Sequence, residues 1–305
     1  MSTPAPIQYL TRGQLDPAKW DACIQAASNS LIYGYSSYLD LMAGQWDALV
    51  LGDYRAVMPL PWRKKWGIRY LYQPAFTQQL GVFSRLPLSG ELVRAFLEAI
   101  PGRFRFAEIF LYYACGLDGL PRHVNLLVPL QEPYETISGR YTRDLRKNLR
   151  HAHAARLVYL RDTDPALIWQ GYRHRTGPRV PHVTQKDYEN FEKLCRRAAD
   201  LGELRVRSVQ DEQGLLCGSL FLVKGGRIYL MESFTGPRAR KKAANHFLLD
   251  QVIREFAGSD LLLDFEGSDI PGIAAFKRNF GPVDQPYYFY RCNRLPRLVR
   301  WIKGS

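Results

Sequence analysis

The sequence lacks several patterns that mark well-known classes of protein. No apolar run approaches the roughly 18 residues of a membrane span, and the first residues lack the basic and apolar segments of a signal peptide. It contains no Cys/His metal spacing, no H-E-x-x-H, no G-x-S-x-G and no Walker A motif. We therefore expect no transmembrane segment, no metal and a cytoplasmic location.

Cysteines are few and are not paired. The chain has five among 305 residues, an odd number with no C-x-x-C spacing, so we expect reduced, mostly buried thiols. The apolar fraction of 46% and the aromatic fraction of 13% suffice for packed cores, and the length suggests about two domains.

Positive charge is in excess. A net charge of +13 indicates an anionic partner such as nucleotide phosphates, tRNA or the surface of an anionic membrane. The alternative is that the basic surface only aids solubility.

The second half of the chain shows a clear order of elements. Helical spacing predicts helices over 164–175 and 184–202, with Thr184 as N-cap. Three strands follow over 204–210, 215–224 and 227–234, and Gly225-Gly226 predicts a hairpin between the last two. Then come a helix over 243–257, a nearly apolar strand over 260–267, a helix over 270–281 and a closing strand over 287–292.

The first half repeats this order more faintly. Helices are predicted over 15–27 and 35–44, a hairpin over 46–62 turning at Gly52-Asp53, and a third strand over 67–76. A helix over 88–101 and a strand over 105–111 follow. The shared order predicts a duplication.

A basic amphipathic helix is predicted between the halves, over 141–156. Leu145, Leu149 and Ala152 share one face. A second face is basic, and it carries Arg143, Arg146, Lys147 and Arg150.

Three segments carry a family resemblance: YTRDLRKNLRHAHAARL, TGPRARKKAANHFLLDQVI and LLLDFEGSDIPGIAAFKRNFG. With the element order, they resemble the GNAT superfamily, in particular Fem-type proteins with tandem GNAT units. The resemblance implies an α/β (α+β) fold of two GNAT-like units, each a mixed, mostly antiparallel sheet flanked by helices. We expect one unit over 1–135 and the other over 136–305, the latter beginning with the basic helix 141–156.

The resemblance also implies an N-acyltransferase that moves an acyl or aminoacyl group to an amine. Acyl-CoA is slightly favoured as donor, and aminoacyl-tRNA is the alternative. The acceptor would be a small molecule or a cell-wall precursor. A second hypothesis is a non-catalytic GNAT-fold protein that binds nucleic acid or anionic lipid.

The loop before helix 243–257 is the expected donor site. In GNAT enzymes this loop wraps the coenzyme A pyrophosphate, and a helix N-terminus suits a phosphate. The residues that match are Arg238, Arg240, Lys241, Lys242, Ala243, Ala244 and Asn245. Ala243 and Asn245 replace the family's glycines, which makes close backbone approach harder. The alternative is a solvated basic loop.

Four residues are candidates for catalysis. Lys277 matches the position of the GNAT tyrosine, where Fem-type enzymes carry a lysine thought to polarise the acyl carbonyl. Glu232, on a face shared with Leu230, is a candidate general base. Asp264 and Glu266 could tune or replace it, and any of the three could instead form a structural ion pair.

We expect the catalytic cleft where strands 227–234 and 260–267 part. A helix connects these strands as a crossover, so they splay and leave backbone N–H groups available to the donor. Glu232 and Lys277 would lie on opposite sides of the new bond.

Overall fold

The structure is a computed structural model that describes residues 6–175, 183–267 and 269–295. It contains two compact units. Unit 1 comprises residues 1–123 and 286–305, and unit 2 comprises residues 124–285.

Unit 1 is built on a sheet of eight strands. These are β1 (Ile7–Thr11), β2 (Trp46–Leu51), β3 (Ala56–Lys65), β4 (Ile68–Leu71), β5 (Phe83–Ser84), β6 (Phe104–Leu111), β7 (Arg122–His123) and β15 (Tyr287–Asn293). Its helices are α1 (Pro17–Ala26), α2 (Ser36–Met42) and α3 (Gly90–Glu98), with 3-10 turns η1 (Arg12–Gln14) and η2 (Ile32–Gly34).

The meander predicted for the first half is confirmed. Strands β2, β3 and β4 pair antiparallel in succession. Helix α3 then leads to β6, which runs parallel to β4. The strand order is β1-β2-β3-β4-β6-β15-β7, with β5 beside β3.

Unit 2 contains a second sheet, of seven strands. These are β8 (Leu126–Pro129), β9 (Val158–Leu160), β10 (Leu204–Asp211), β11 (Gly214–Lys224), β12 (Arg227–Thr235), β13 (Leu262–Asp264) and β14 (Val283–Asp284). Its helices are α4 (Tyr134–Gly139), α5 (Arg143–Ala154), α6 (Pro165–Arg175), α7 (Gln185–Asp200), α8 (Ala244–Phe256) and α9 (Pro271–Arg278).

The unit 2 sheet repeats the unit 1 sheet strand for strand. Its order is β9-β10-β11-β12-β13-β8-β14. Antiparallel β10, β11 and β12 are followed by α8 and by β13, which is parallel to β12. Two mixed, mostly antiparallel sheets flanked by helices were predicted, and this fold class is confirmed.

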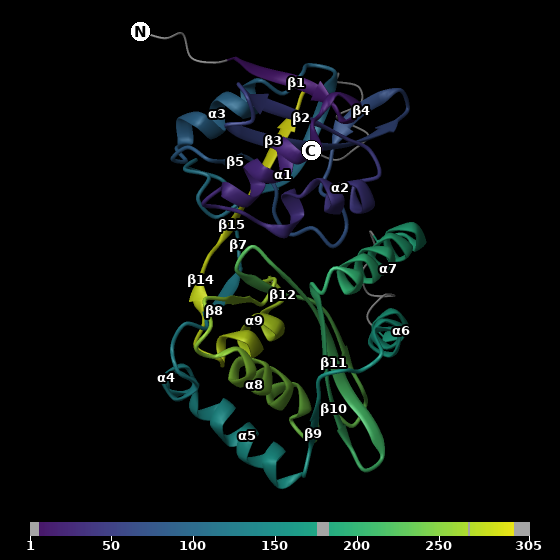
Figure 1. Ribbon diagram of the computed structural model, residues 1–305, viewed down its shortest axis with the longest axis vertical. Helices are drawn as coiled ribbons and strands as arrows, with labels where there is room; N and C mark the ends of the chain where they lie inside the picture. The colour runs from purple at the N-terminus through teal and green to yellow at the C-terminus, as the bar shows by residue number, and fades with distance from the viewer. Residues whose placement is uncertain (1–5, 176–182, 268, 296–305) are drawn as a thin grey trace. The chain divides into compact units, whose positions relative to one another are not determined.

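Helices cover both faces of the unit 2 sheet. Figure 1 shows α6 and α7 on one side of β10–β12 and α8 on the other. On the first face, Gly218 of β11 lies against Ile168 of α6, where a β-carbon would clash. On the opposite face, Phe221 of β11 packs in one core with Leu249 and Val252 of α8.

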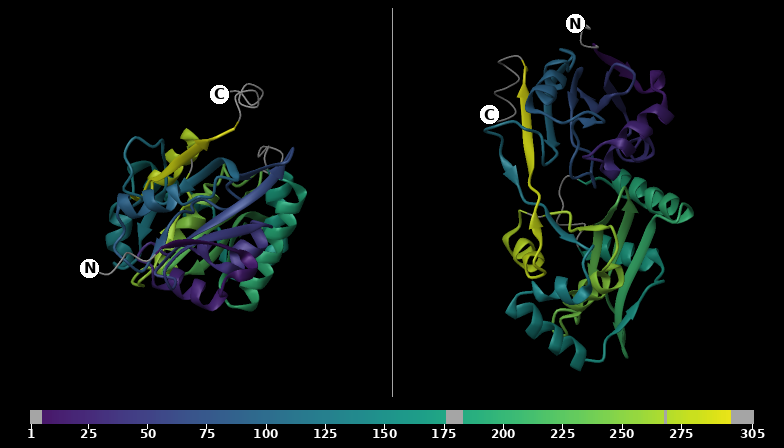
Figure 2. Two further views of the ribbon diagram at one scale, coloured as in Figure 1. Left: turned by 90° about the horizontal axis from the view of Figure 1, so that it is seen from above. Right: turned by 60° about the vertical axis from the view of Figure 1, so that its left-hand side comes forward.

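The sixth place in each sheet is filled by a strand that is distant in the chain. The closing strand β15 pairs with β6 of unit 1 over Tyr288–Asn293, and Figure 2 shows it (yellow) beside the unit 1 strands. We expected it to close the C-terminal unit. Its counterpart in unit 2 is β8, which pairs with β13. The compact units therefore divide at 123/124 and 285/286 and not at 135/136.

Local signals explain several boundaries. Thr184 caps α7, as predicted, by accepting the N–H of Asp187 while the Asp187 carboxylate accepts the Thr184 N–H. Gly225 and Gly226 both take positive φ in the β11–β12 turn. Strand β13 is shorter than predicted because Glu266 is left-handed (φ 61°) and turns the chain away.

Candidate active site

A β-bulge decides which way the candidate base points. In the β11–β12 ladder Leu220 faces Glu232, but the next residue, Phe221, faces Leu230. Met231 is therefore an extra residue in β12. Such an insertion reverses the alternation of side chains beyond it.

The bulge places Glu232 on the α6/α7 face of the sheet. Leu230 packs in the core on the α8 side, whereas Glu232 accepts a hydrogen bond from Tyr172 of α6. Phe234, two residues on, lies against Gly171 of the same helix. The prediction that Leu230 and Glu232 share a face is therefore wrong.

The two parallel strands part where the cleft was predicted. Their ladder ends at the pair Tyr229–Asp264, although β12 continues to Thr235. Beyond Asp264 the chain turns through two successive left-handed residues, Glu266 and Gly267. A left-handed glutamate is strained, and such strain gathers at functional sites.

Lys277 of α9 lies at this turn with its ammonium group buried. The residue is 8% exposed, and Nζ donates to the carbonyl oxygens of Phe265 and Gly267, the latter at 2.7 Å. Burial lowers the pKa of Lys277 to about 8, against the opposing effects of Glu266, Asp264 and Glu232.

Both glutamates near Lys277 have raised pKa values. Burial raises the pKa of Glu232 to about 8, although the Tyr172 hydrogen bond and the charge of Lys277 act against it. Burial also raises the pKa of Glu266 to about 8, again opposed by Lys277. The site therefore holds two acids and one cation that exchange protons close to neutral pH.

Asp264 is held in a structural ion pair. Its side chain is 1% exposed and lies 2.9 Å from Nη1 of Arg227. Its other oxygen accepts the backbone N–H of Glu266 at 2.9 Å. These contacts fix the turn that carries Glu266, so Asp264 acts on the site by positioning it.

Two cations of the expected donor loop are bound to one carboxylate. Arg238 and Lys242 approach Asp211, at the end of β10, to 2.6 and 2.8 Å. These two cations hold the pKa of Asp211 well below its usual range. They therefore anchor the loop, and the carboxylate compensates one of their two positive charges.

The other two cations of the loop face solvent. Arg240 and Lys241 are exposed, and the Lys241 carbonyl contacts Nε2 of His151 on α5 at 2.8 Å. Asn148 of α5 likewise contacts His246 of α8 at 3.4 Å. The donor loop and the predicted basic helix thus meet.

The loop ends in a left-handed alanine. Ala243 has φ 51° and precedes α8 without a side-chain cap. Ala244 donates its N–H to Ala239 at 3.0 Å, and the Asn245 amide reaches Oγ1 of Thr235 at 2.9 Å. By helix geometry the N–H groups of Asn245 and His246 have no intrahelical acceptor.

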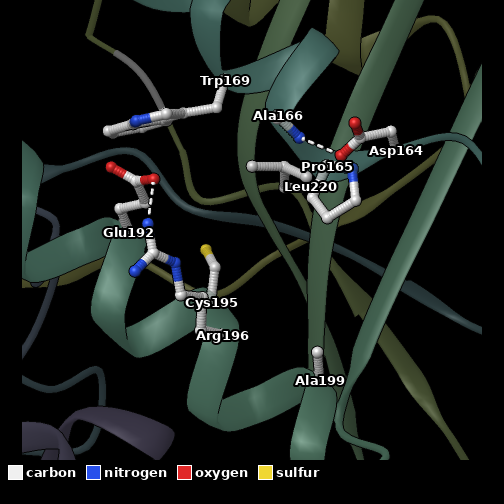
Figure 3. Close-up of a pocket in the computed structure, with 9 residues that line it drawn as sticks. All are labelled: Asp164, Pro165, Ala166, Trp169, Glu192, Cys195, Arg196, Ala199 and Leu220. Atoms are coloured by element: carbon white, nitrogen blue, oxygen red, sulfur yellow. Dashed lines mark hydrogen bonds and ion pairs between the residues drawn. The ribbon is translucent and has the colours of Figure 1, made fainter.

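A pocket of about 280 Å³ lies on the same face of the sheet as Glu232. Figure 3 shows the Cys195 thiol and the Glu192–Arg196 ion pair of α7 on one side of it. It is lined by Asp164, Pro165, Ala166, Trp169, Glu192, Cys195, Arg196, Ala199 and Leu220. Leu220 is the cross-strand partner of Glu232, so the pocket reaches the strand pair that carries the base.

Sequence reasoning missed three residues that shape the site. Tyr172 was part of a helix with no distinguishing signal. Asp211 lay in the segment between two predicted strands, and Arg227 at the start of a third. Each acts through a contact between elements distant in sequence, which a local pattern does not encode.

Comparison with known proteins agrees with this architecture. Residues 139–278 match the family model of the acetyltransferase (GNAT) domain. The structure is similar to FemX, with 12% identity and a TM-score of 0.63 over 97% of this chain and 100% of that one. A conserved protein of unknown function from Bacteroides thetaiotaomicron has 9% identity and a TM-score of 0.59, over 95% and 99% of the two chains.

These likenesses establish the fold. With two units of equal strand order, the chain has a Fem-like tandem GNAT fold, and its C-terminal unit contains a GNAT domain, the fold of acyltransferases. Among curated proteins, none matches this sequence.

Two expected absences can be compared with the structure. No helix in the described part of the chain is long and apolar enough to cross a membrane. Nor do the described residues contain a group of three or more His, Cys, Asp or Glu side chains that could hold a metal ion.

Proposed function

We propose that unit 2 transfers an acyl or aminoacyl group from an activated donor to an amine. The observation that carries this proposal is the meeting of Glu232, Glu266 and Lys277 where β12 leaves β13. A base and a cation with pKa values near 8 lie there beside the edge of β12 that extends past its ladder with β13. General-base and electrostatic catalysis of acyl transfer can use this combination.

Each group has one role in the proposed reaction. Glu232 accepts a proton from the attacking amine as the new C–N bond forms. The Lys277 ammonium stabilises the negative charge on the acyl carbonyl and then gives a proton to the leaving thiolate or ribose oxygen. Backbone N–H groups of β12 beyond Tyr229 hold the donor. Glu266, when it is ionised, favours the protonated form of Lys277.

Acyl-CoA is the first donor to test. The uncapped first turn of α8 and the exposed Arg240 and Lys241 suit a pyrophosphate. Aminoacyl-tRNA is the second donor, because the exposed basic face of α5 continues from this loop. That helix has 12 residues, so its cations extend beyond the reach of one pyrophosphate.

The pocket beside Leu220 supports an amine as acceptor. Glu192 is paired with Arg196 in the lining, and Asp164 adds a further carboxylate to walls that are otherwise mostly apolar, which suits an amine attached to an apolar body. A small molecule and a cell-wall precursor both fit this description.

The donor can be identified by binding to the full chain. We expect CoA to raise the melting temperature of the wild type, and Arg240→Glu/Lys241→Glu to weaken CoA binding in calorimetry by about tenfold or more per lost contact. Lys147→Glu/Arg150→Glu on α5 is the matched charge control. It should leave CoA binding unchanged and weaken only the binding of tRNA.

Transfer itself is measured with labelled acetyl-CoA and simple amines, and with aminoacyl-tRNA. Binding of CoA or tRNA without transfer to any amine would support the non-catalytic alternative. If neither is bound, the proposal fails.

A further inference from the structure

The hairpin between β3 and β4 extends past its neighbour in the unit 1 sheet. Strand β3 pairs with β2 only over Ala56–Pro61, and beyond this it pairs only with β4, from Trp62 to Lys65. Figure 1 shows the turn that joins the two strands at the edge of unit 1. Side chains at this tip can therefore meet a partner without rearrangement of the sheet.

The tip carries a tryptophan in a position that stability does not favour. Trp66 (φ 50°) and Gly67 (φ 79°) are the two central residues of the turn. In such a turn Asn-Gly is the preferred pair, since both residues need positive φ. A bulky residue there is a genuine outlier, which points to a role for the indole outside folding.

The indole is presented to solvent. Trp66 is 76% exposed, the most exposed of the large apolar residues described. One contact is the Lys65 ammonium, 4.8 Å from its ring centre. An exposed apolar side chain of this size is typical of a docking surface.

Basic residues flank this indole in the sequence. Arg63, Lys64 and Lys65 precede it and Arg69 follows it. No Asp or Glu occurs between Asp53 and Glu91. The surface of a bilayer with anionic lipids has the complementary charge, and tryptophan and basic side chains anchor proteins in its headgroup layer.

We propose that the β3–β4 tip docks unit 1 on the surface of an anionic lipid bilayer, with Trp66 inserted among the headgroups. A bilayer is a continuous charged plane, so one turn with a single indole and a ring of cations suffices. An RNA helix would require cations spread along a longer track, whereas these gather at one turn. The inference goes beyond the proposed acyl transfer and is independent of it.

The decisive variant is Trp66→Asn. It introduces the preferred Asn-Gly turn, so the melting temperature should be equal to or higher than that of the wild type. The probe is phosphatidylcholine vesicles with and without phosphatidylglycerol, in co-sedimentation with the full chain. The wild type should bind only the anionic vesicles, more weakly at high salt, and Trp66→Asn should lose binding at least about tenfold.

Charge is tested separately, with a matched control. Lys64→Glu/Lys65→Glu should reduce vesicle binding by about fivefold for each cation removed, whereas Lys193→Glu/Arg197→Glu on α7 makes the same charge change and should have little effect. Equal binding by wild type and Trp66→Asn would overturn the proposal. So would equal binding to neutral and anionic vesicles, or a loss of affinity by the tip variants for an RNA duplex alone.

Discussion

The two units have the same strand order but differ in what lies beyond the end of their parallel strand pair. In unit 1, β4 ends at Leu71, and Leu80 lies beside the end of β6. The Leu80 carbonyl accepts the N–H of Tyr112, and the Leu80 N–H donates to the carbonyl of Phe110 at 2.8 Å. Gln73 accepts the N–H of Phe110. In unit 1 the chain after β4 thus continues the pairing along β6, whereas in unit 2 the ladder between β12 and β13 ends at the pair Tyr229–Asp264.

The two units also differ in how many charged side chains they bury. Among the described Asp, Glu, Lys, Arg and His residues of unit 1, Asp47 is the one that is buried. Unit 2 buries Asp187, Arg207, Asp211, Arg227, Asp250, Asp264 and Lys277. Buried charges are costly unless they are paired, so their concentration in unit 2 supports the proposal that this unit carries the chemistry.

The comparison also shows that the sheet shared by the two units does not by itself provide the candidate site. Strand order and crossover are shared, yet the described part of unit 1 has no helix after β6 to match α9. Without α9 there is no position for a lysine at the end of the central strand. A GNAT-like sheet is therefore not sufficient; the open strand edge and the buried cation complete the site.

The largest effect is expected from removing the cation. Lys277→Met keeps the volume and should lower turnover by about 100-fold or more, as when a preorganised electrostatic donor is lost. Glu232→Gln should lower it less, because Glu266 remains. Both should still bind the donor, so steady-state kinetics should show a fall in kcat with little change in KM for the donor.

The matched control for these variants is Glu189→Gln, on the exposed surface of α7 and paired with Lys186. Its turnover should be near that of the wild type. Native turnover by both Lys277→Met and Glu232→Gln would show that unit 2 does not use this site, and the contrast between the units would then lose its functional meaning.

A second, intermediate effect concerns stability and pH. Glu232 and Glu266 have pKa values raised from 4.5 to about 8, so between these values the folded chain holds protons that the unfolded chain has released. Their contribution to stability is therefore lost as pH rises toward 8. The pKa of Lys277 is lowered from 10.5 to about 8, so its contribution is lost as pH falls through 8.

These groups together predict a minimum of their contribution to the free energy of unfolding near pH 8. Melting temperatures measured across pH should show it in the wild type. Glu232→Gln/Glu266→Gln should remove the fall below pH 8, and Lys277→Met should remove the rise above it. Identical pH curves for all three proteins would mean that the groups titrate normally.

The fold was largely predictable because its signals are local. Hairpin glycines such as Gly225 and Gly226, the Thr184 cap and helical spacing each depend on a few neighbouring residues. The exchange of β8 and β15 between the sheets was not predictable in this way. Strands of four and seven residues carry no information on which distant edge they will pair with.

The sequence predicted that the candidate residues would lie near one another, but it did not predict how they are oriented. Lys277, Glu232 and Glu266 do gather around the parting strands. The orientation of Glu232 was wrong because one extra residue, Met231, reverses the alternation. The sequence also did not predict that Arg238 and Lys242 are bound to a carboxylate, because only the fold brings Asp211 close to them.

The smallest effect is expected at the start of the crossover helices, where the units again differ. In unit 1, Ser89 caps α3 by accepting the N–H of Leu92. In unit 2, Ala243 stands before α8 in the left-handed conformation without a side-chain cap. A side-chain cap supplies an acceptor to the free N–H groups of a helix, so we propose the uncapped α8 as the helix that binds an external anion.

Ala243→Gly should therefore be tolerated, with a change in the free energy of unfolding within about 0.5 kcal/mol. Glycine relieves a left-handed penalty of about 1 kcal/mol, which offsets the loss of a buried methyl worth about 0.8 kcal/mol. Ala244→Gly, one residue on, is the matched control. It removes a buried methyl inside the helix with no strain to relieve, so denaturant unfolding should show a loss of about 1 to 2 kcal/mol. Donor affinity should rise in Ala243→Gly, because glycine lets the backbone approach a phosphate more closely. Equal losses of stability in both variants would mean that Ala243 is an ordinary helix residue and that the two crossover helices begin alike.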